Sequence, residues 1–132
     1  MRVKFSSLIK SPQSEDQKIA FESKLEKEEE EISIDTQEPF TSYTFTNPEN
    51  KGVLRIEIYN NKALLITEFS TIVLDKEQKH TIEYNTTYGQ MFLESSLQLL
   101  SKTENEVNIH YSLYTLKGEL VGQYFVVLEI EN

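Results

Sequence analysis

The sequence contains no cysteine, and it has only four glycines and three prolines in 132 residues. Without cysteine there is no disulfide framework, no thiolate metal site and no cysteine nucleophile, and the chain suits a reducing compartment. The longest apolar run, Tyr124–Leu128, is far shorter than the roughly 20 residues that a membrane helix needs. The first eight residues lack the continuous apolar segment of a signal peptide. We therefore expect a cytoplasmic protein.

Basic residues are also scarce. The chain has 13 Lys and Arg against 22 Asp and Glu, which gives a net charge of −9. Nucleic acids and anionic membrane surfaces are bound mainly through cationic side chains, and the sequence contains no cluster of Lys and Arg. We expect neither a nucleic acid nor a membrane as a partner, and we interpret the acidity as a source of solubility.

Motifs of catalysis and of metal binding are missing as well. The two histidines, His80 and His110, have no second histidine or cysteine at the spacing of a zinc site. No glycines are spaced for a phosphate-binding loop, and no serine lies in a nucleophile-elbow pattern. We predict no catalytic residue, no metal ligand and no cofactor. A triad assembled from distant residues stays open, so whether the chain is an enzyme is uncertain.

What the chain does contain is a period-two alternation of apolar and polar residues, which is typical of half-buried strands. Turn residues separate these segments, most clearly at Asn47–Gly52, Asn60–Asn61 and Lys117–Gly118. Gly89, between two segments rich in aromatic and β-branched residues, predicts a sharp bend, a bulge or a close backbone approach. The strands expected from this pattern are Arg2–Lys10, Glu31–Thr36, Phe40–Thr46, Val53–Tyr59, Lys62–Phe69, Thr71–Asp75, Lys79–Tyr84, Gln90–Ser101, Val107–Leu116 and Glu119–Ile130.

Two segments allow more than one interpretation. Gln17–Glu31 has the composition of a helix, but its apolar residues have the spacing of a strand. Gln90–Ser101 also has a competing helical pattern, which the serines in its middle weaken. The acidic run Glu28–Glu31 is interpreted as a solvated turn and sheet edge, because charge at an edge resists unwanted pairing.

Many short strands at regular intervals predict an all-β antiparallel fold in one domain, residues 1–132. We expect a barrel of roughly ten strands, because closure removes the exposed edges of a long meander. The last segment, Glu119–Ile130, is apolar on both faces, which indicates a central strand or a barrel strand covered from outside.

From Tyr84 to Ile130 the sequence resembles the C-terminal half of the YwiB-like family of small bacterial proteins of unknown function. The family motif is a tyrosine, a threonine or similar residue two positions later, then an aromatic residue and a glycine. Those places are occupied here by Tyr84, Thr86, Thr87, Tyr88 and Gly89. A later apolar stretch with a tyrosine is matched by Ile109–Leu113. The resemblance implies a lipocalin-like (calycin-type) barrel over nearly the whole chain, and it favours a strand at Gln17–Lys27.

The chain departs from this family at one place. Family members often carry an arginine and a glycine where this sequence has Glu68 and Ser70. A role of that arginine with an anionic ligand therefore does not transfer. The resemblance implies no activity, since fold does not define function.

Tyrosines are the candidate functional residues. Tyr43, Tyr84, Tyr88 and Tyr111 lie in separate strands or turns, and together they could line a ligand cavity in a barrel; the alternative is that they pack the core and the barrel ends. One hypothesis is therefore a module that binds a small, partly apolar molecule. The other is a protein-interaction or structural module that uses its acidic surface or a strand-mediated homodimer interface. We leave open whether the chain is a monomer or a homodimer.

Overall fold

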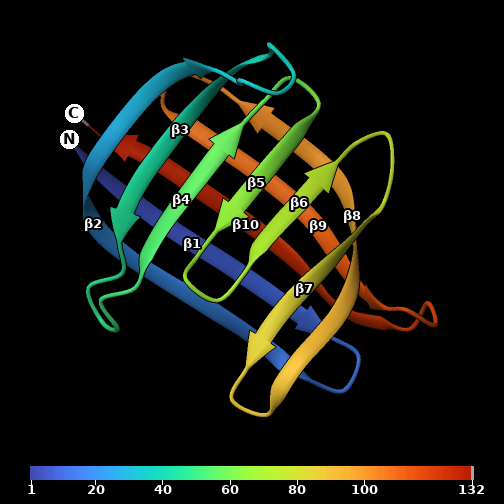
Figure 1. Ribbon diagram of the computed structural model, residues 1–132. Coiled ribbons are helices and arrows are strands. Elements are labelled where there is room, and N and C mark those ends of the chain that lie inside the picture. Colours follow the sequence, from blue (N-terminus) through green and yellow to red (C-terminus); the bar gives the residue numbers. More distant parts are fainter. Residues whose placement is uncertain (132) are drawn as a thin grey trace.

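A computed structural model describes residues 1–131, except for the side chain of Thr86, and it consists of ten antiparallel strands (Figure 1). The predicted all-β antiparallel fold is confirmed, whereas Asn132, the last residue of the expected domain, lies outside the described residues. The strands are β1 (Arg2–Ser11), β2 (Ser14–Ile32), β3 (Pro39–Thr46), β4 (Val53–Ile58), β5 (Lys62–Ile66), β6 (Thr71–Asp75), β7 (His80–Thr86), β8 (Gly89–Lys102), β9 (Glu106–Thr115) and β10 (Leu120–Glu131).

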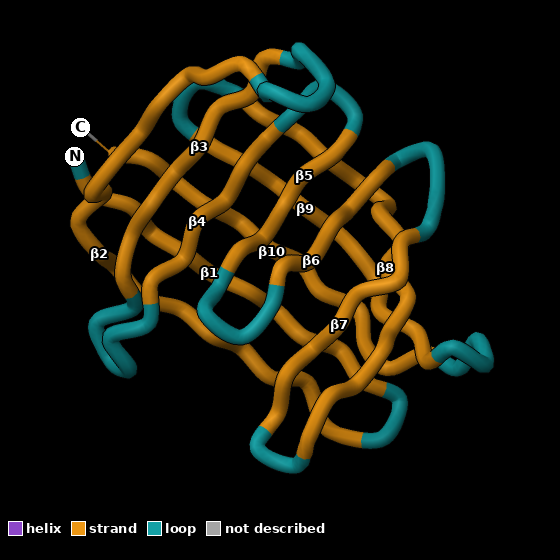
Figure 2. The backbone as a smooth tube through the Cα atoms, in the orientation of Figure 1, coloured by secondary structure: helices purple, strands orange, loops and turns teal. Residues whose placement is uncertain are grey.

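All ten strands belong to one sheet with the order β6-β5-β4-β3-β2-β1-β10-β9-β8-β7. Strand β1 pairs with β10 from Arg2 opposite Glu131 to Lys10 opposite Gln123, and this ladder joins the two ends of the chain. The sheet curls into a nearly closed barrel, and successive turns lie at alternate ends of it (Figure 2). Because β10 is hydrogen-bonded to β1 on one side and to β9 on the other, it is a central strand.

The segment whose sequence allowed either a helix or a strand lies in β2. Gln17–Glu31 is extended throughout, so the interpretation as a strand is confirmed. The acidic run is not a turn, however: Glu28–Glu31 continues the ladder of β2 with β3. The expected strand at Glu31–Thr36 is wrong, because residues 33–38 form a turn in which Ser33 N–H donates to Glu38 O and Gln37 N–H donates to Ser33 O.

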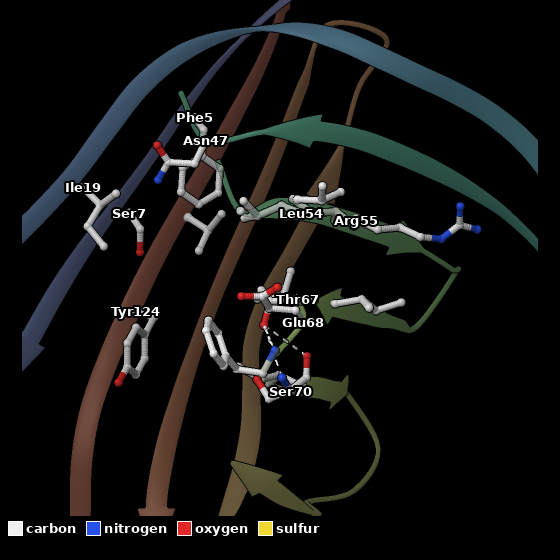
Figure 3. Close-up of a pocket in the computed structure, with 18 of the residues that line it drawn as sticks. Phe5, Ser7, Ile19, Asn47, Leu54, Arg55, Thr67, Glu68, Ser70 and Tyr124 are labelled. Atoms are coloured by element: carbon white, nitrogen blue, oxygen red, sulfur yellow. Dashed lines mark hydrogen bonds between the residues drawn. The ribbon is translucent and has the colours of Figure 1, made fainter. Parts of the chain in front are cut away.

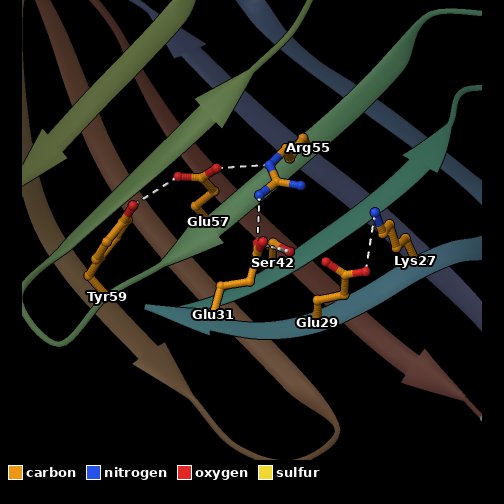
Figure 4. A network of polar contacts seen from close by, with 7 residues as sticks. All are labelled: Lys27, Glu29, Glu31, Ser42, Arg55, Glu57 and Tyr59. Carbon is orange, nitrogen blue, oxygen red and sulfur yellow. Dashed lines mark hydrogen bonds and ion pairs between the residues drawn. The ribbon is translucent and has the colours of Figure 1, made fainter. Parts of the chain in front are cut away.

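Cations on the outer surface stabilise the acidic end of β2. Glu31 lies 2.9 Å from the guanidinium of Arg55, which also contacts Glu57 at 2.8 Å, and Lys27 pairs with Glu29 at 3.1 Å (Figure 4). The phenol of Tyr59 donates to Glu57. The guanidinium of Arg55 is thus paired with two carboxylates. The Arg55–Glu31 ion pair ties β4 to β2 across β3, which lies between them, and local charge patterns do not reveal how the strands are arranged.

Glycine matters most at two turns. Gly89 has φ of 121° and Gly118 has φ of 89°, values that side chains rarely adopt. The bend expected at Gly89 is therefore present, as the β7–β8 hairpin. Asn60 and Asn61 connect β4 and β5 as the sequence predicts, although neither has a positive φ.

One half of the barrel interior is filled. Alternate residues of each strand point inward, and at the end near the two termini they form a continuous apolar core. Phe45 belongs to this core, and the rings of Phe5 and Phe21 pack against it at the border of the other half, with the three centroids 5.1–6.0 Å apart. The most deeply buried members include Val3, Tyr43, Phe45, Ile56, Leu74, Val107, Ile109 and Leu128.

Side chains bridge the seam between β6 and β7, the two ends of the sheet. Ser95 Oγ of β8 donates to Val73 O of β6, and His80 Nε2 lies 3.1 Å from Asp75 Oδ2. Burial by itself would raise the pKa of Asp75. The hydrogen bond from the Glu77 amide and the contact with His80 outweigh burial, and the pKa lies below its ordinary value.

No helix within residues 1–131 has the length and apolar character needed to cross a membrane.

Replacing Ile109 with alanine should lower the free energy of unfolding by about 2–5 kcal/mol, because the change leaves a cavity in the filled half. The same replacement at Ile34, whose side chain is 91% exposed in the β2–β3 turn, should change it by less than about 0.5 kcal/mol. Urea unfolding followed by circular dichroism measures both variants. Equal effects would contradict the position of Ile109 in the core.

Candidate functional site

The other half of the barrel is hollow. A cavity of about 360 Å³ opens at the end opposite the two termini (Figure 3). Most of its wall comes from inward-facing residues of β1, β2, β4, β5, β6, β9 and β10, and its rim comes from the β3–β4 and β5–β6 turns. The lining is largely apolar: Phe5, Ile9, Ile19, Phe21, Leu54, Ile56, Leu65, Ile72 and Val126.

Small residues make room for this cavity. Ser7 occupies an inward position of β1, flanked by Ile19 on β2 and Val126 on β10, where the filled half has larger apolar residues. Gly122 is also inward and buried. A Cβ atom at Gly122 would lie 3.3 Å from the hydroxyl of Tyr124, so the glycine lets this ring fold along the strand.

Three tyrosines supply the polar part of the wall. The rings of Tyr111 and Tyr124 are stacked, with centroids 4.8 Å apart and an interplanar angle of 8°. Tyr84, on β7, lines the same cavity. Burial, followed by the nearby phenols of Tyr124 and Tyr84, raises the pKa of Tyr111. Burial also raises the pKa of Tyr124. A phenol can donate one hydrogen bond and accept others.

Two turns form the rim. In the β3–β4 turn, Asn47 accepts a hydrogen bond from the Glu49 amide. In the β5–β6 turn, Thr67 Oγ1 accepts from the Phe69 and Ser70 amides. The amide group of Asn85 donates to Phe69 O at 3.2 Å and fastens the β5–β6 turn to β7. The Phe69 ring is 57% exposed, so the rim presents apolar surface to the entrance.

The four tyrosines predicted from the sequence separate into two groups. Tyr84 and Tyr111 both line the cavity. Tyr43 faces inward but lies in the filled half with 1% of its surface exposed, and Tyr88 is 99% exposed at the tip of the β7–β8 hairpin. The side chain of Thr86, part of the family-like motif, lies outside the described residues.

Other lining residues were not selected from the sequence. Tyr124 has the same inward parity as Val126 and Leu128, and the nearby Gly122 was a signal that its ring needs space. Ser7 is a polar residue on the apolar parity of its strand, which also marks an unusual position. The contribution of the β5–β6 turn had no local signal, because it depends on how the barrel closes.

The histidines lie away from the cavity. His80 contacts Asp75 at the seam, and His110 packs on the outer surface against Phe125, with ring centroids 4.9 Å apart. Within residues 1–131, no three acidic or histidine side chains gather in a geometry that could hold a metal ion. The cavity wall therefore offers hydroxyls, apolar surface and few charges, a composition suited to binding.

A second hollow, of about 510 Å³, lies at the opposite end of the barrel. Glu30, Phe40, Tyr59 and Lys102 are among its lining residues. Although its volume is larger, it is more open to solvent and has a more polar wall. We therefore consider the apolar cavity the better candidate site, because ligand sites are concave and mostly apolar.

The fold and the cavity define an up-and-down antiparallel β-barrel that is packed at one end and hollow at the other. Its fold is similar to that of the ywiB protein from Bacillus subtilis, whose crystal structure superposes with a TM-score of 0.61. The alignment covers 99% of this chain and 91% of that chain, at 11% sequence identity. This likeness concerns the fold alone.

A relative is also found by sequence. An uncharacterized protein of Mycoplasmopsis pulmonis (strain UAB CTIP) is 28% identical over 123 residues, which cover 86% of this chain and 98% of that protein. No family model matches the chain. Neither description names an activity, so these comparisons identify no function.

The buried phenol of Tyr111 should make the protein sensitive to alkali. Its pKa in the folded state is raised, so the stability that depends on the neutral phenol is present below the unfolded value of about 10 and is lost as pH rises above it. Replacing Tyr111 with phenylalanine should therefore move the alkaline unfolding midpoint to higher pH. Circular dichroism during an alkaline titration measures this midpoint.

The control is Tyr88→Phe, at the exposed hairpin tip, which should leave the midpoint unchanged. If Tyr111→Phe unfolds at the same pH as the unsubstituted protein, the buried phenol does not limit alkaline stability.

Proposed function

We propose that this protein binds a small, partly apolar molecule in the hollow half of its barrel. The observation that carries the proposal is the contrast between the two halves of one interior. A continuous cluster of buried apolar side chains occupies one half, whereas the other keeps about 360 Å³ of space between apolar walls. Ligand pockets typically have volumes of about 300–1,000 Å³ and a few fixed polar groups.

The polar groups of this cavity are well placed for such a role. Tyr111 and Tyr124 stack on each other, which fixes the orientation of both rings. Their phenols, with that of Tyr84, offer hydrogen bonds to a polar group of the ligand, and the apolar wall favours its hydrocarbon part. The exposed ring of Phe69 extends the apolar surface to the entrance.

We also propose that the chain is a member of the YwiB-like family, with a lipocalin-like (calycin-type) barrel. The Tyr84–Gly89 motif and the similarity to the fold of the Bacillus subtilis protein support this assignment. It carries no ligand with it, so ligand binding must be tested on this protein directly.

A matched pair of serine variants tests the cavity. Ser7 faces the cavity, whereas the preceding Ser6 lies beside an outer groove of the same strand. The neutral dye Nile red, which fluoresces in apolar surroundings, serves as the probe. Replacing Ser7 with phenylalanine should fill the space and weaken dye binding by about tenfold or more, equivalent to about 1.4 kcal/mol.

Ser6→Phe should bind the dye as the unsubstituted protein does, and thermal unfolding shows whether each variant is folded. The proposal fails if the dye does not bind, or if folded Ser7→Phe and Ser6→Phe bind it equally well. Native mass spectrometry of the protein purified from its own host would then identify an occupant by its added mass.

A second candidate function is self-association through the outer face of the sheet. The register places Leu8, Phe125, His110 and Leu99 in one row across β1, β10, β9 and β8. This row, which we call the outer stripe, is nearly uncharged on a protein with net charge −9. Two copies could meet there with little repulsion.

Light scattering after size exclusion measures this association. If the outer stripe forms a homodimer, the mass should be twice that of one chain, and Phe125→Glu should halve it. A monomer at all concentrations would exclude this candidate.

A further inference from the structure

The cavity lining contains two charged residues among those described, Arg55 and Glu68. The guanidinium of Arg55 is directed to the outer face, where it contacts Glu57 and Glu31 at 2.8 and 2.9 Å. Figure 3 shows this side chain leading away from Ser7 and Tyr124. Its charge is therefore already paired and turned away from a ligand.

Glu68 has a different position. It belongs to the β5–β6 turn at the rim, is exposed to solvent, and takes part in none of the ion pairs formed within residues 1–131. The turn that carries it is held to β7 by the hydrogen bond from Asn85 to Phe69 O. A carboxylate is thus kept at the entrance, with no cation of the lining available to neutralise it.

Aromatic rings surround the same entrance. Phe69 follows Glu68 in the turn, and Tyr84 and Tyr124 line the same cavity. The face of an aromatic ring carries negative charge density and attracts cations, and quaternary ammonium ligands are recognised by aromatic rings in this way. The net charge of −9 adds an overall field that attracts cations and repels anions.

We propose that the ligand is a protonated amine with an apolar chain, bound with its ammonium group beside Glu68 and its chain inside the cavity. This inference rests on the proposed function and names the chemical class of the ligand. The ammonium group stays at the rim because moving a charge into the apolar interior would remove its hydration without an equivalent partner. A carboxylate ligand would meet Glu68, and the cation among the described lining residues, Arg55, is already paired with Glu57 and Glu31.

Three probes with ten carbon atoms each test the charge preference of the cavity: decylamine, decanol and decanoate. Each is used below its critical micelle concentration, and the measured quantity is the probe concentration that displaces bound Nile red. At neutral pH and low salt, decylamine should displace the dye at about one-tenth of the decanoate concentration, as expected for an exposed ion pair combined with a cation–π contact. Decanol should lie between them. Raising the ionic strength should narrow the difference between the two charged probes.

Substitutions at two glutamates, Glu68 and Glu77, test whether the preference for the cationic probe depends on the carboxylate at the cavity entrance. Glu68→Gln should reduce the difference between decylamine and decanoate to about threefold or less, and Glu68→Lys should reverse the order of the two probes. Glu77→Gln removes the same charge in the β6–β7 turn at the opposite end of the barrel. It should keep the preference for decylamine.

The outcomes separate this inference from the proposed function. Three results would overturn the amine assignment: no preference among the probes, a preference for decanoate, or no displacement by decylamine. If Nile red still binds in these cases, the cavity remains a binding site. Equal effects of Glu68→Gln and Glu77→Gln also overturn it, because the preference would then come from the overall charge. Failure of the unsubstituted protein to bind Nile red removes the proposed function itself.

Discussion

The antiparallel ladder between β1 and β10 is the constraint on which the rest of the structure depends. It pairs Arg2–Lys10 with Gln123–Glu131, so the first and the last strand of the chain become neighbours. Without it, β1 and β10 would each present an unpaired edge, and the sheet would divide into β1–β6 and β7–β10. With it, the inward faces of ten strands surround one interior. Because this contact joins the most distant parts of the sequence, it has a high cost in chain entropy.

The interior that results is used unevenly. Leucine, isoleucine, valine and aromatic rings fill the end near the termini, whereas at the other end Ser7 leaves space and Gly122 lets the ring of Tyr124 lie along the wall. Apolar side chains that border an unfilled space lose contacts with neighbouring atoms, so a hollow of this kind lowers stability. Local choices that conflict with stable packing are expected mainly at functional sites. This is the physical basis for assigning binding to the hollow half.

Charged side chains on the outer face and at the cavity entrance also differ in how they are paired. On the outer face, Arg55 links Glu31 and Glu57 on two different strands, so the acidic end of β2 is balanced by a cation that also supports the sheet. At the cavity entrance, Glu68 carries the charge opposite to that of the arginine which the resemblance to the YwiB-like family would imply there. Two barrels of similar fold with opposite charges at this place would select ligands of opposite charge. The fold alone therefore does not define the ligand.

The sequence by itself determined the strand content, most of the turns and the inward parity of each segment, because a period of two is a local property of the backbone and its side chains. The tertiary structure decided that Glu28–Glu31 lies within a ladder and that Ile34 lies in a turn. It also decided which tyrosines meet: Tyr84, Tyr111 and Tyr124 border one cavity, whereas Tyr43 is packed in the core. All four have inward parity, and only the position of each strand along the barrel axis determines whether such a side chain reaches the filled or the hollow half.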